Sequence, residues 1–178
     1  AILNQFQQYS QGENTVTNNV LLMLSNLYRI NPKYYEEFIK GIIDDNNEYE
    51  LTPIFKQQFG NEVDGVIDGY IQIKASKIII ETKLHGLEGV DKLIKYAKSF
   101  NKHEQNVLLH LSSRRYAESE IKNIKDKLKK ITELDGIKFN SVTYQDLVDQ
   151  LKELANNYNY EQYLQRLNED FENYCLGM

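Results

Sequence analysis

The chain is poor in cysteine, proline and tryptophan, with one, two and none of them in 178 residues. A single thiol, Cys175, excludes an internal disulfide and is typical of a protein kept in a reducing compartment. No apolar run approaches the roughly 18 residues that a membrane-spanning helix needs. The N-terminal residues AILNQFQQYS contain no basic segment followed by an apolar stretch, so no signal peptide is predicted. We therefore expect a cytoplasmic protein without membrane association.

The chain also lacks an excess of basic residues. It carries 21 Lys and Arg against 26 Asp and Glu, a net charge of −5, which argues against a general nucleic-acid-binding protein. The acidic excess lies in residues 144–178, which hold seven acids and two basic residues, whereas residues 1–143 hold 19 of each sign. Seven lysines fall within residues 74–103 and five within residues 122–130. Each cluster is either a solvated helix face or a surface that follows a phosphate backbone.

What is present is typical of a globular chain: 41% hydrophobic and 26% charged residues, in a length that fits one domain with a short appendage. Apolar residues recur at helical spacing in some segments and alternate or run together in others. The first predicted helix follows an N-cap at Asn14 or Thr15 and stops before Pro32. Further helices are predicted over residues 33–43, 88–101, 116–131, 145–155 and 160–175. Strands are predicted over residues 54–59, 63–74, 77–84, 106–111 and 136–144.

The segment KIIIETKL, residues 77–84, opens with three consecutive isoleucines, which is typical of a strand buried on both faces. The short polar turn before it predicts an antiparallel hairpin with the preceding strand. The later strands alternate with helices. We therefore predict an α/β (α+β) fold, with a mixed sheet of about five strands, a central antiparallel hairpin and helices on both faces. Residues 1–156 form this domain, and residues 157–178 form an acidic, aromatic helical extension.

Two charged residues close the apolar strand. Glu81 and Lys83 point to the same side because strand side chains alternate. Placing them there costs desolvation energy unless they are paired or bind something. A hairpin that turns at residues 74–77 brings Asp68 back alongside the end of this strand, so Asp68 and Glu81 can meet on one metal ion with Lys83 beside it.

This set of groups suits phosphodiester hydrolysis. Carboxylate oxygens bind Mg²⁺ (or Mn²⁺), which keeps several water ligands for the reaction. The ion lowers the pKa of a bound water and stabilises developing negative charge. A neighbouring lysine orients the attacking water or steadies the charge on the scissile phosphate.

The segments Ile67-Asp68-Gly69-Tyr70-Ile71 and Ile80-Glu81-Thr82-Lys83 resemble the PD-(D/E)xK nuclease superfamily, whose fold is called restriction-endonuclease-like. Asp68 matches the first acid of the motif, although Ile67 replaces the usual proline, and Glu81 and Lys83 match the remainder. The likeness extends over roughly residues 13 to 144. It implies an Mg²⁺-dependent endonuclease, with DNA favoured over RNA because the superfamily mostly cuts DNA.

The same resemblance implies further site residues. The backbone carbonyl of Thr82 is expected to ligate the metal, and Glu13, at the start of the first helix, is similar to a glutamate that reaches the site in many members. Many members also place glutamine, leucine and tyrosine on the helix after the lysine. Here Lys92 replaces that glutamine, whereas the leucine and Tyr96 are kept. The residues expected to guide the polynucleotide backbone are Lys74, Lys77, Lys92, Lys95 and Lys98.

Several assignments have rivals. Asp64 has the same strand parity as Asp68, which is favoured because it lies closer to the turn and fits the motif. Glu13 has an alternative role in complementing the helix dipole. His85 is expected in an exit loop, where it is either an ordinary polar residue or a phosphate contact. His110 is expected to be a core or interface histidine rather than a metal ligand.

Two other functions stay open. The first is a catalytically inactive module of the same fold that binds nucleic acid or a protein partner. The second is one part of a homodimer or larger assembly, joined through the C-terminal helix by Phe171, Tyr174 and Leu176. The substrate structure, the number of metal ions, and a role in defence or in repair are left open by the sequence.

Overall fold

The computed structural model describes residues 4–6, 12–43, 54–61, 65–73, 76–100, 105–131 and 136–177; for residues 54–61, 65–73, 76 and 105 the description is of the backbone. Within these ranges, helices and strands follow one another in the order expected from the sequence. The predicted mixed α/β class is confirmed. No helix among the described residues is long and apolar enough to cross a membrane.

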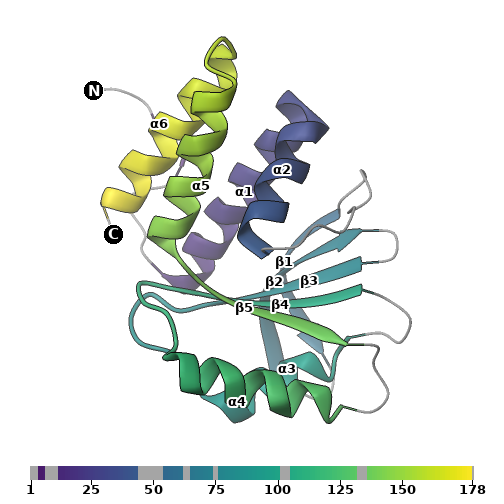
Figure 1. Cartoon of the computed structure of the whole chain (residues 1–178). Coiled ribbons are helices and arrows are strands. Elements are labelled where there is room, and N and C mark those ends of the chain that lie inside the picture. Colours follow the sequence, from purple (N-terminus) through teal and green to yellow (C-terminus); the bar gives the residue numbers. More distant parts are fainter. Residues whose placement is uncertain are drawn as a thin grey trace.

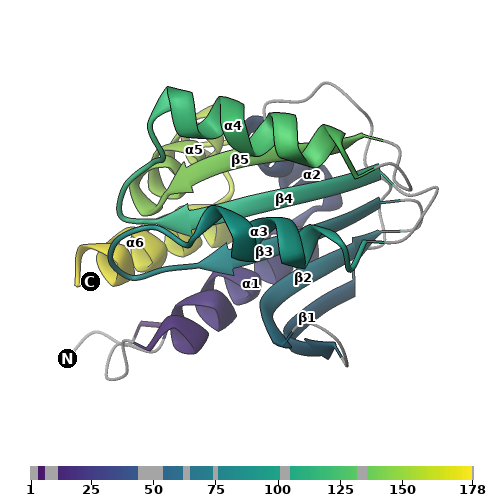
Figure 2. The same ribbon diagram turned by 90° about the horizontal axis from the view of Figure 1, so that it is seen from below.

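One sheet runs through the middle of the molecule (Figure 1). Its strands lie in chain order and are β1 (Ile54–Asn61), β2 (Gly65–Ile73), β3 (Ser76–Thr82), β4 (Gln105–Ser112) and β5 (Ile137–Thr143). The β1–β2 and β2–β3 pairs are antiparallel, whereas the β3–β4 and β4–β5 pairs are parallel. The carboxyl ends of β3, β4 and β5 therefore share one edge of the sheet, which lies beside the first turn of α1 (Figure 2).

Helices cover both faces of the sheet (Figures 1 and 2). The face that is uppermost in Figure 1 carries α1 (Glu13–Ile30), α2 (Pro32–Ile43), α5 (Tyr144–Asn157) and α6 (Gln162–Leu176). The other face carries α3 (Val90–Ala97) and α4 (Glu118–Lys129), which connect the parallel strands. Parallel neighbours require such crossover connections, because a tight turn cannot join them.

The isoleucine run of β3 is buried on both faces. Ile78 and Ile80 pack in the core beneath the four-helix layer, whereas Ile79 packs against α3 and α4. All three are at most 3% exposed. Each such side chain contributes roughly 2 kcal/mol of hydrophobic stabilisation, so the apolar half of β3 fixes the position of the charged residues that follow it.

The C-terminal helix α6 belongs to the same core. Phe171 and Tyr174 are buried there at 0% and 1% exposure, so they are not available to a partner chain as the sequence suggested. Leu176, the third residue expected at an interface, is exposed. The spacing of this helix predicts either ordinary core or a packing face for another chain, and Phe171 and Tyr174 take the first of these roles. The domain boundary at residue 156 stays a prediction.

Two helix ends differ from expectation. Gly12, in extended conformation, occupies the N-cap of α1, and its carbonyl accepts a hydrogen bond from the Val16 N–H at 3.1 Å. Asn14 and Thr15 therefore lie in the first turn instead of capping it. The helix α5 starts at Tyr144, one residue earlier than predicted, because Thr143 and Asp146 form a reciprocal capping box that ends β5 and starts the helix.

Candidate functional site

The predicted acid and lysine lie at the carboxyl end of the parallel strands. Glu81 of β3 pairs in register with His110 of β4, and both side chains are almost fully buried, at 3% and 0% exposure. They share strand parity with Ile79 and Leu108, which pack against the α3–α4 layer. Ligands of open α/β sheets commonly bind at this edge, outside the carboxyl ends of the strands.

Lys83 is fixed by its backbone as it leaves the sheet. Its N–H donates to the carbonyl of Leu111 at 2.8 Å, and its carbonyl accepts a hydrogen bond from the Tyr144 hydroxyl at 2.6 Å. Its ammonium lies 3.2 Å from Oε2 of Glu88 and 3.9 Å from Oε2 of Glu13. Burial lowers the pKa of Lys83, but the two carboxylates outweigh burial and raise it above its ordinary value. Lys83 is therefore a charged ammonium at neutral pH.

Glu88 is a member of this site that the sequence reasoning missed. Its Oε2 lies 3.3 Å from the ammonium of Lys92 as well as 3.2 Å from that of Lys83. Its Oε1 accepts the Gly89 N–H at 3.0 Å. We call Glu13, Lys83, Glu88 and Lys92 the Lys83 cluster. The spacing of Glu88 and Lys92, four residues apart, was the available signal, because acids and lysines so spaced often pair at helix starts.

The Glu88 carboxylate is strongly stabilised in its charged form. Burial alone would raise its pKa, but hydrogen bonds with Glu81, the Gly89 N–H, Lys83 and Lys92 outweigh burial and lower the pKa to about 2. The side chain is only 9% exposed. Glu81 lies within reach of Glu88, so the Lys83 cluster adjoins the acid of the predicted motif. Because Glu88 is ionised, a hydrogen bond between the two carboxyl groups requires that the proton be on Glu81.

The loop that carries Glu88 is anchored through its backbone. The Glu88 N–H donates to Nε2 of His110 at 3.2 Å, and the Glu88 carbonyl accepts a hydrogen bond from the Tyr116 hydroxyl. Nearby, the Ser112 hydroxyl donates to the Gly86 carbonyl at 2.6 Å, where Gly86 adopts a positive φ of 75°. These contacts hold the loop whatever the side chain at position 88.

His110 has the core position expected of it, although its Nδ1 is buried without a hydrogen-bond partner among the described residues. Because Nε2 accepts a backbone N–H, the imidazole is neutral with its proton on Nδ1. Burial lowers the pKa of His110 to about 4, the Glu88 carboxylate opposes this shift, and the Lys83 ammonium adds to it. Its ring also packs edge-on against Tyr116, with the ring centroids 4.7 Å apart.

The first turn of α1 is joined to the end of β3. The Thr17 hydroxyl lies 2.8 Å from that of Thr82 and donates to the Glu13 carbonyl at 3.0 Å. Both threonines are fully buried. This contact places Glu13 at the site edge, where its side chain is 39% exposed.

Asp68 is placed by strand register. Gly69 of β2 pairs with Ile80 of β3, so Asp68 and Glu81 are the next residues along the two neighbouring strands. Its rival Asp64 lies outside the described residues. Among the described side chains, no group of three or more His, Cys, Asp or Glu is arranged to hold a metal ion. Glu81 and the Thr82 carbonyl nevertheless supply hard oxygen donors, the type that Mg²⁺ and Mn²⁺ prefer.

The lysines expected to guide a polynucleotide have different environments. Lys95 is exposed on α3, Lys98 is exposed at the C-cap of that helix, and Lys92 is half-exposed with its ammonium 5.8 Å from the ring centroid of Tyr96. Lys77 is 6% exposed, because strand parity turns it toward the same layer as Ile79. Burial argues against its expected role on a phosphate-binding surface. Lys74 lies outside the described residues.

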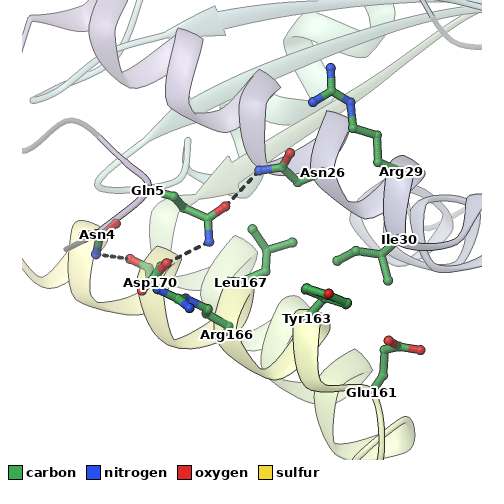
Figure 3. Close-up of a pocket in the computed structure, with 10 residues that line it drawn as sticks. All are labelled: Asn4, Gln5, Asn26, Arg29, Ile30, Glu161, Tyr163, Arg166, Leu167 and Asp170. Atoms are coloured by element: carbon green, nitrogen blue, oxygen red, sulfur yellow. Dashed lines mark hydrogen bonds between the residues drawn. The ribbon is translucent and has the colours of Figure 1, made fainter. Parts of the chain in front are cut away.

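A separate cavity of about 760 Å³ lies between α1 and α6 (Figure 3). Its wall includes a chain of side-chain hydrogen bonds in which Asn26 donates to Gln5 at 2.9 Å and Gln5 donates to Asp170 at 2.7 Å. Arg29 and Tyr163 also line it. The α1 residues in its lining come from the last turns of that helix, at the opposite end from Glu13, so this cavity is distinct from the Lys83 cluster.

Comparison with known proteins gives little further information. The chain is similar, at 16% sequence identity and a TM-score of 0.33, to the small subunit of the heterodimeric restriction endonuclease R.BspD6I. The alignment covers 89% of this chain and 96% of that subunit. No protein-family model and no curated protein matches the chain. A TM-score of 0.33 is too low to establish a shared fold.

Proposed function

We propose that this protein is a metal-dependent nuclease of the PD-(D/E)xK type, with a restriction-endonuclease-like fold, which hydrolyses phosphodiester bonds in DNA in preference to RNA. One observation carries the proposal. In the antiparallel register of β2 and β3, Gly69 pairs with Ile80, so Asp68, before Gly69, and Glu81, after Ile80, are the next residues on the two strands. Opposed residues of antiparallel strands have Cβ atoms about 5 Å apart on one face. Lys83 follows two residues later and is charged.

In this proposal Asp68, Glu81 and the Thr82 carbonyl hold Mg²⁺ or Mn²⁺. The bound ion supplies a water of lowered pKa and stabilises charge on the phosphate. Lys83, as an ammonium, donates hydrogen bonds and cannot accept a proton. Its role is therefore to orient the water or stabilise the phosphate charge, rather than to act as a general base.

The remaining residues assist binding and orientation. Glu13, from α1, would assist by a hydrogen bond or through water on the ion, and its 3.9 Å contact with Lys83 supports a position at the site. The exposed positions of Lys95 and Lys98, together with Lys92, support a path for the polynucleotide backbone along α3. Contacts of this kind give affinity without sequence preference.

The second candidate is a catalytically inactive module of the same fold that binds nucleic acid or a protein. It is favoured by three exposed apolar residues in and just before α6, Tyr160, Tyr163 and Leu176. A thermal shift on adding Mn²⁺ distinguishes the two. The nuclease is stabilised by the ion, because ligands that bind only the folded state raise its stability, and the inactive module is not.

The proposed activity is tested by incubating the purified protein and Lys83→Ala with single-stranded, double-stranded and branched DNA, and with matching RNA, in Mn²⁺ or Mg²⁺. We expect cleavage by the wild type that chelation abolishes and that Lys83→Ala reduces by at least about 100-fold. Absence of cleavage on every substrate, or equal cleavage by the variant, would contradict the proposal.

A further inference from the structure

We infer that Glu88 is a positioning residue, whose carboxylate holds the ammonium groups of Lys83 and Lys92 together at the carboxyl end of β3. The expected effect of Glu88 on catalysis rests on the proposed nuclease function. Its expected effect on Lys83 and Lys92 rests on the geometry of the Lys83 cluster alone.

A single oxygen makes both contacts. Oε2 of Glu88 lies 3.2 Å from Nζ of Lys83 and 3.3 Å from Nζ of Lys92, so the two nitrogens lie within about 6.5 Å of each other. Two ammonium groups at that separation repel unless an anion lies between them. The second oxygen accepts the Gly89 N–H, which restricts rotation of the carboxylate about its last bond.

The burial of Glu88 distinguishes it from an ordinary helix-start acid. Its side chain is 9% exposed, whereas Asp91, three residues later, is fully exposed and contacts only Lys127, at 3.6 Å, among the ion pairs of the described residues. A carboxylate can stay charged in a buried position only where contacts with its partners offset the free-energy cost of removing it from water. Here these partners are the lysine of the predicted motif and the first lysine of α3.

The backbone contacts of Glu88 separate the effect of its side chain from that of the loop. His110 accepts its N–H and Tyr116 donates to its carbonyl, and neither contact requires a carboxylate. A Glu88→Gln substitution therefore keeps the loop in place, removes the negative charge and changes the side-chain contact with Glu81. We expect Lys83 and Lys92 to move apart, so that Lys83 loses its fixed direction toward the reacting phosphate.

The first test does not depend on activity. Wild type, Glu88→Gln and the matched control Asp91→Asn are labelled briefly with an amine-acetylating reagent, and the modification of each lysine is measured by mass spectrometry. We expect the labelling rates of Lys83 and Lys92 to rise several-fold in Glu88→Gln, because each amine loses the carboxylate oxygen that it contacts and becomes more accessible to the reagent. Asp91→Asn should leave both rates unchanged. Equal rates in folded Glu88→Gln and wild type overturn the inference.

The second test measures catalysis with a saturable DNA substrate in Mn²⁺. We expect kcat of Glu88→Gln to fall about 10- to 100-fold with little change in KM, because misplacement of an orienting group affects the transition state more than binding. Asp91→Asn should keep the wild-type values. An unchanged kcat in Glu88→Gln, in an active wild type, overturns the inference. If the wild type cleaves nothing, the proposed function fails and the labelling result alone decides the role of Glu88.

A third variant covers the case in which Glu88→Gln does not fold. Lys92→Met leaves Glu88 with Lys83 as its main cationic partner, so labelling of Lys83 should slow relative to wild type. Faster or unchanged labelling of Lys83 in that variant means that Glu88 does not hold the two ammonium groups jointly, and the inference is then wrong.

Discussion

Replacing His110 by glutamine should remove part of the acid sensitivity of the fold. The imidazole is fully buried, and its Nε2 accepts the Glu88 N–H at 3.2 Å. Burial lowers its pKa from 6.5 to about 4, with Glu88 opposing the shift and Lys83 adding to it. Between these values the unfolded chain binds a proton that the folded protein does not. Stability is therefore complete above pH 6.5 and falls as the pH drops toward 4.

The size of this loss of stability follows from the difference between the pKa of His110 in the unfolded chain and its pKa in the folded protein. Each pH unit between these two pKa values lowers the free energy of unfolding by about 1.4 kcal/mol. The loss through His110 is therefore about 2 kcal/mol between pH 7 and pH 5, and about 3 kcal/mol by pH 4. Glutamine can still accept the Glu88 N–H but does not titrate.

The assay is urea denaturation of wild type, His110→Gln and the exposed control His85→Gln at pH 7 and pH 5. The loss of stability between the two pH values should be about 2 kcal/mol smaller in His110→Gln than in wild type. His85→Gln should lose as much as wild type. An equal loss in His110→Gln and wild type refutes the reasoning, whatever the absolute stability of the variant.

Three further predictions concern the site and its support. Tyr144→Phe removes the hydroxyl that donates to the Lys83 carbonyl, and it should lower the free energy of unfolding by about 1 kcal/mol in urea denaturation. Ile79→Ala should lower it by about 2–5 kcal/mol, because Ile79 is fully buried against α3 and α4; a loss below about 1 kcal/mol would mean that this face is not packed. Lys95→Ala and Lys98→Ala should each reduce the salt dependence of DNA binding, measured by fluorescence anisotropy, by about one unit in the log–log slope, and unchanged slopes would exclude these lysines from phosphate contact.

The spacing of hydrophobic residues and the alternation of side chains along strands predicted much of the fold. They also predicted that Glu81 and Lys83 point to the same side. The isoleucine run predicted a strand buried on both faces, which the two cores around β3 bear out. Alternation along that strand and the residue after it placed Glu81 and Lys83 on one side, and Glu88 lies next to both of them. Local sequence carries this information because strand side chains alternate whatever surrounds them.

The remaining features depend on contacts between distant segments. Glu88 joins the site because the loop after Lys83 is tied to His110, 22 residues further along the chain. Lys77 is buried because strand parity turns it toward the layer against which Ile79 packs, whereas a lysine at the start of a strand is expected to be exposed. The aromatic stripe of α6 predicts a packing face but does not say whether the partner is the same chain. In each case the pattern fixes an orientation, and tertiary packing decides what lies opposite.

The central claim is that acids from β2 and β3 share one divalent ion beside Lys83. Calorimetric titration of Mn²⁺ into wild type, Asp68→Asn, Glu81→Gln, the double variant and Asp64→Asn tests it most directly. We predict that either of the first two substitutions removes most of the binding, that the double variant loses no more, and that Asp64→Asn binds as wild type does. Failure of the wild type to bind Mn²⁺, or undiminished binding by both Asp68→Asn and Glu81→Gln, would contradict the claim.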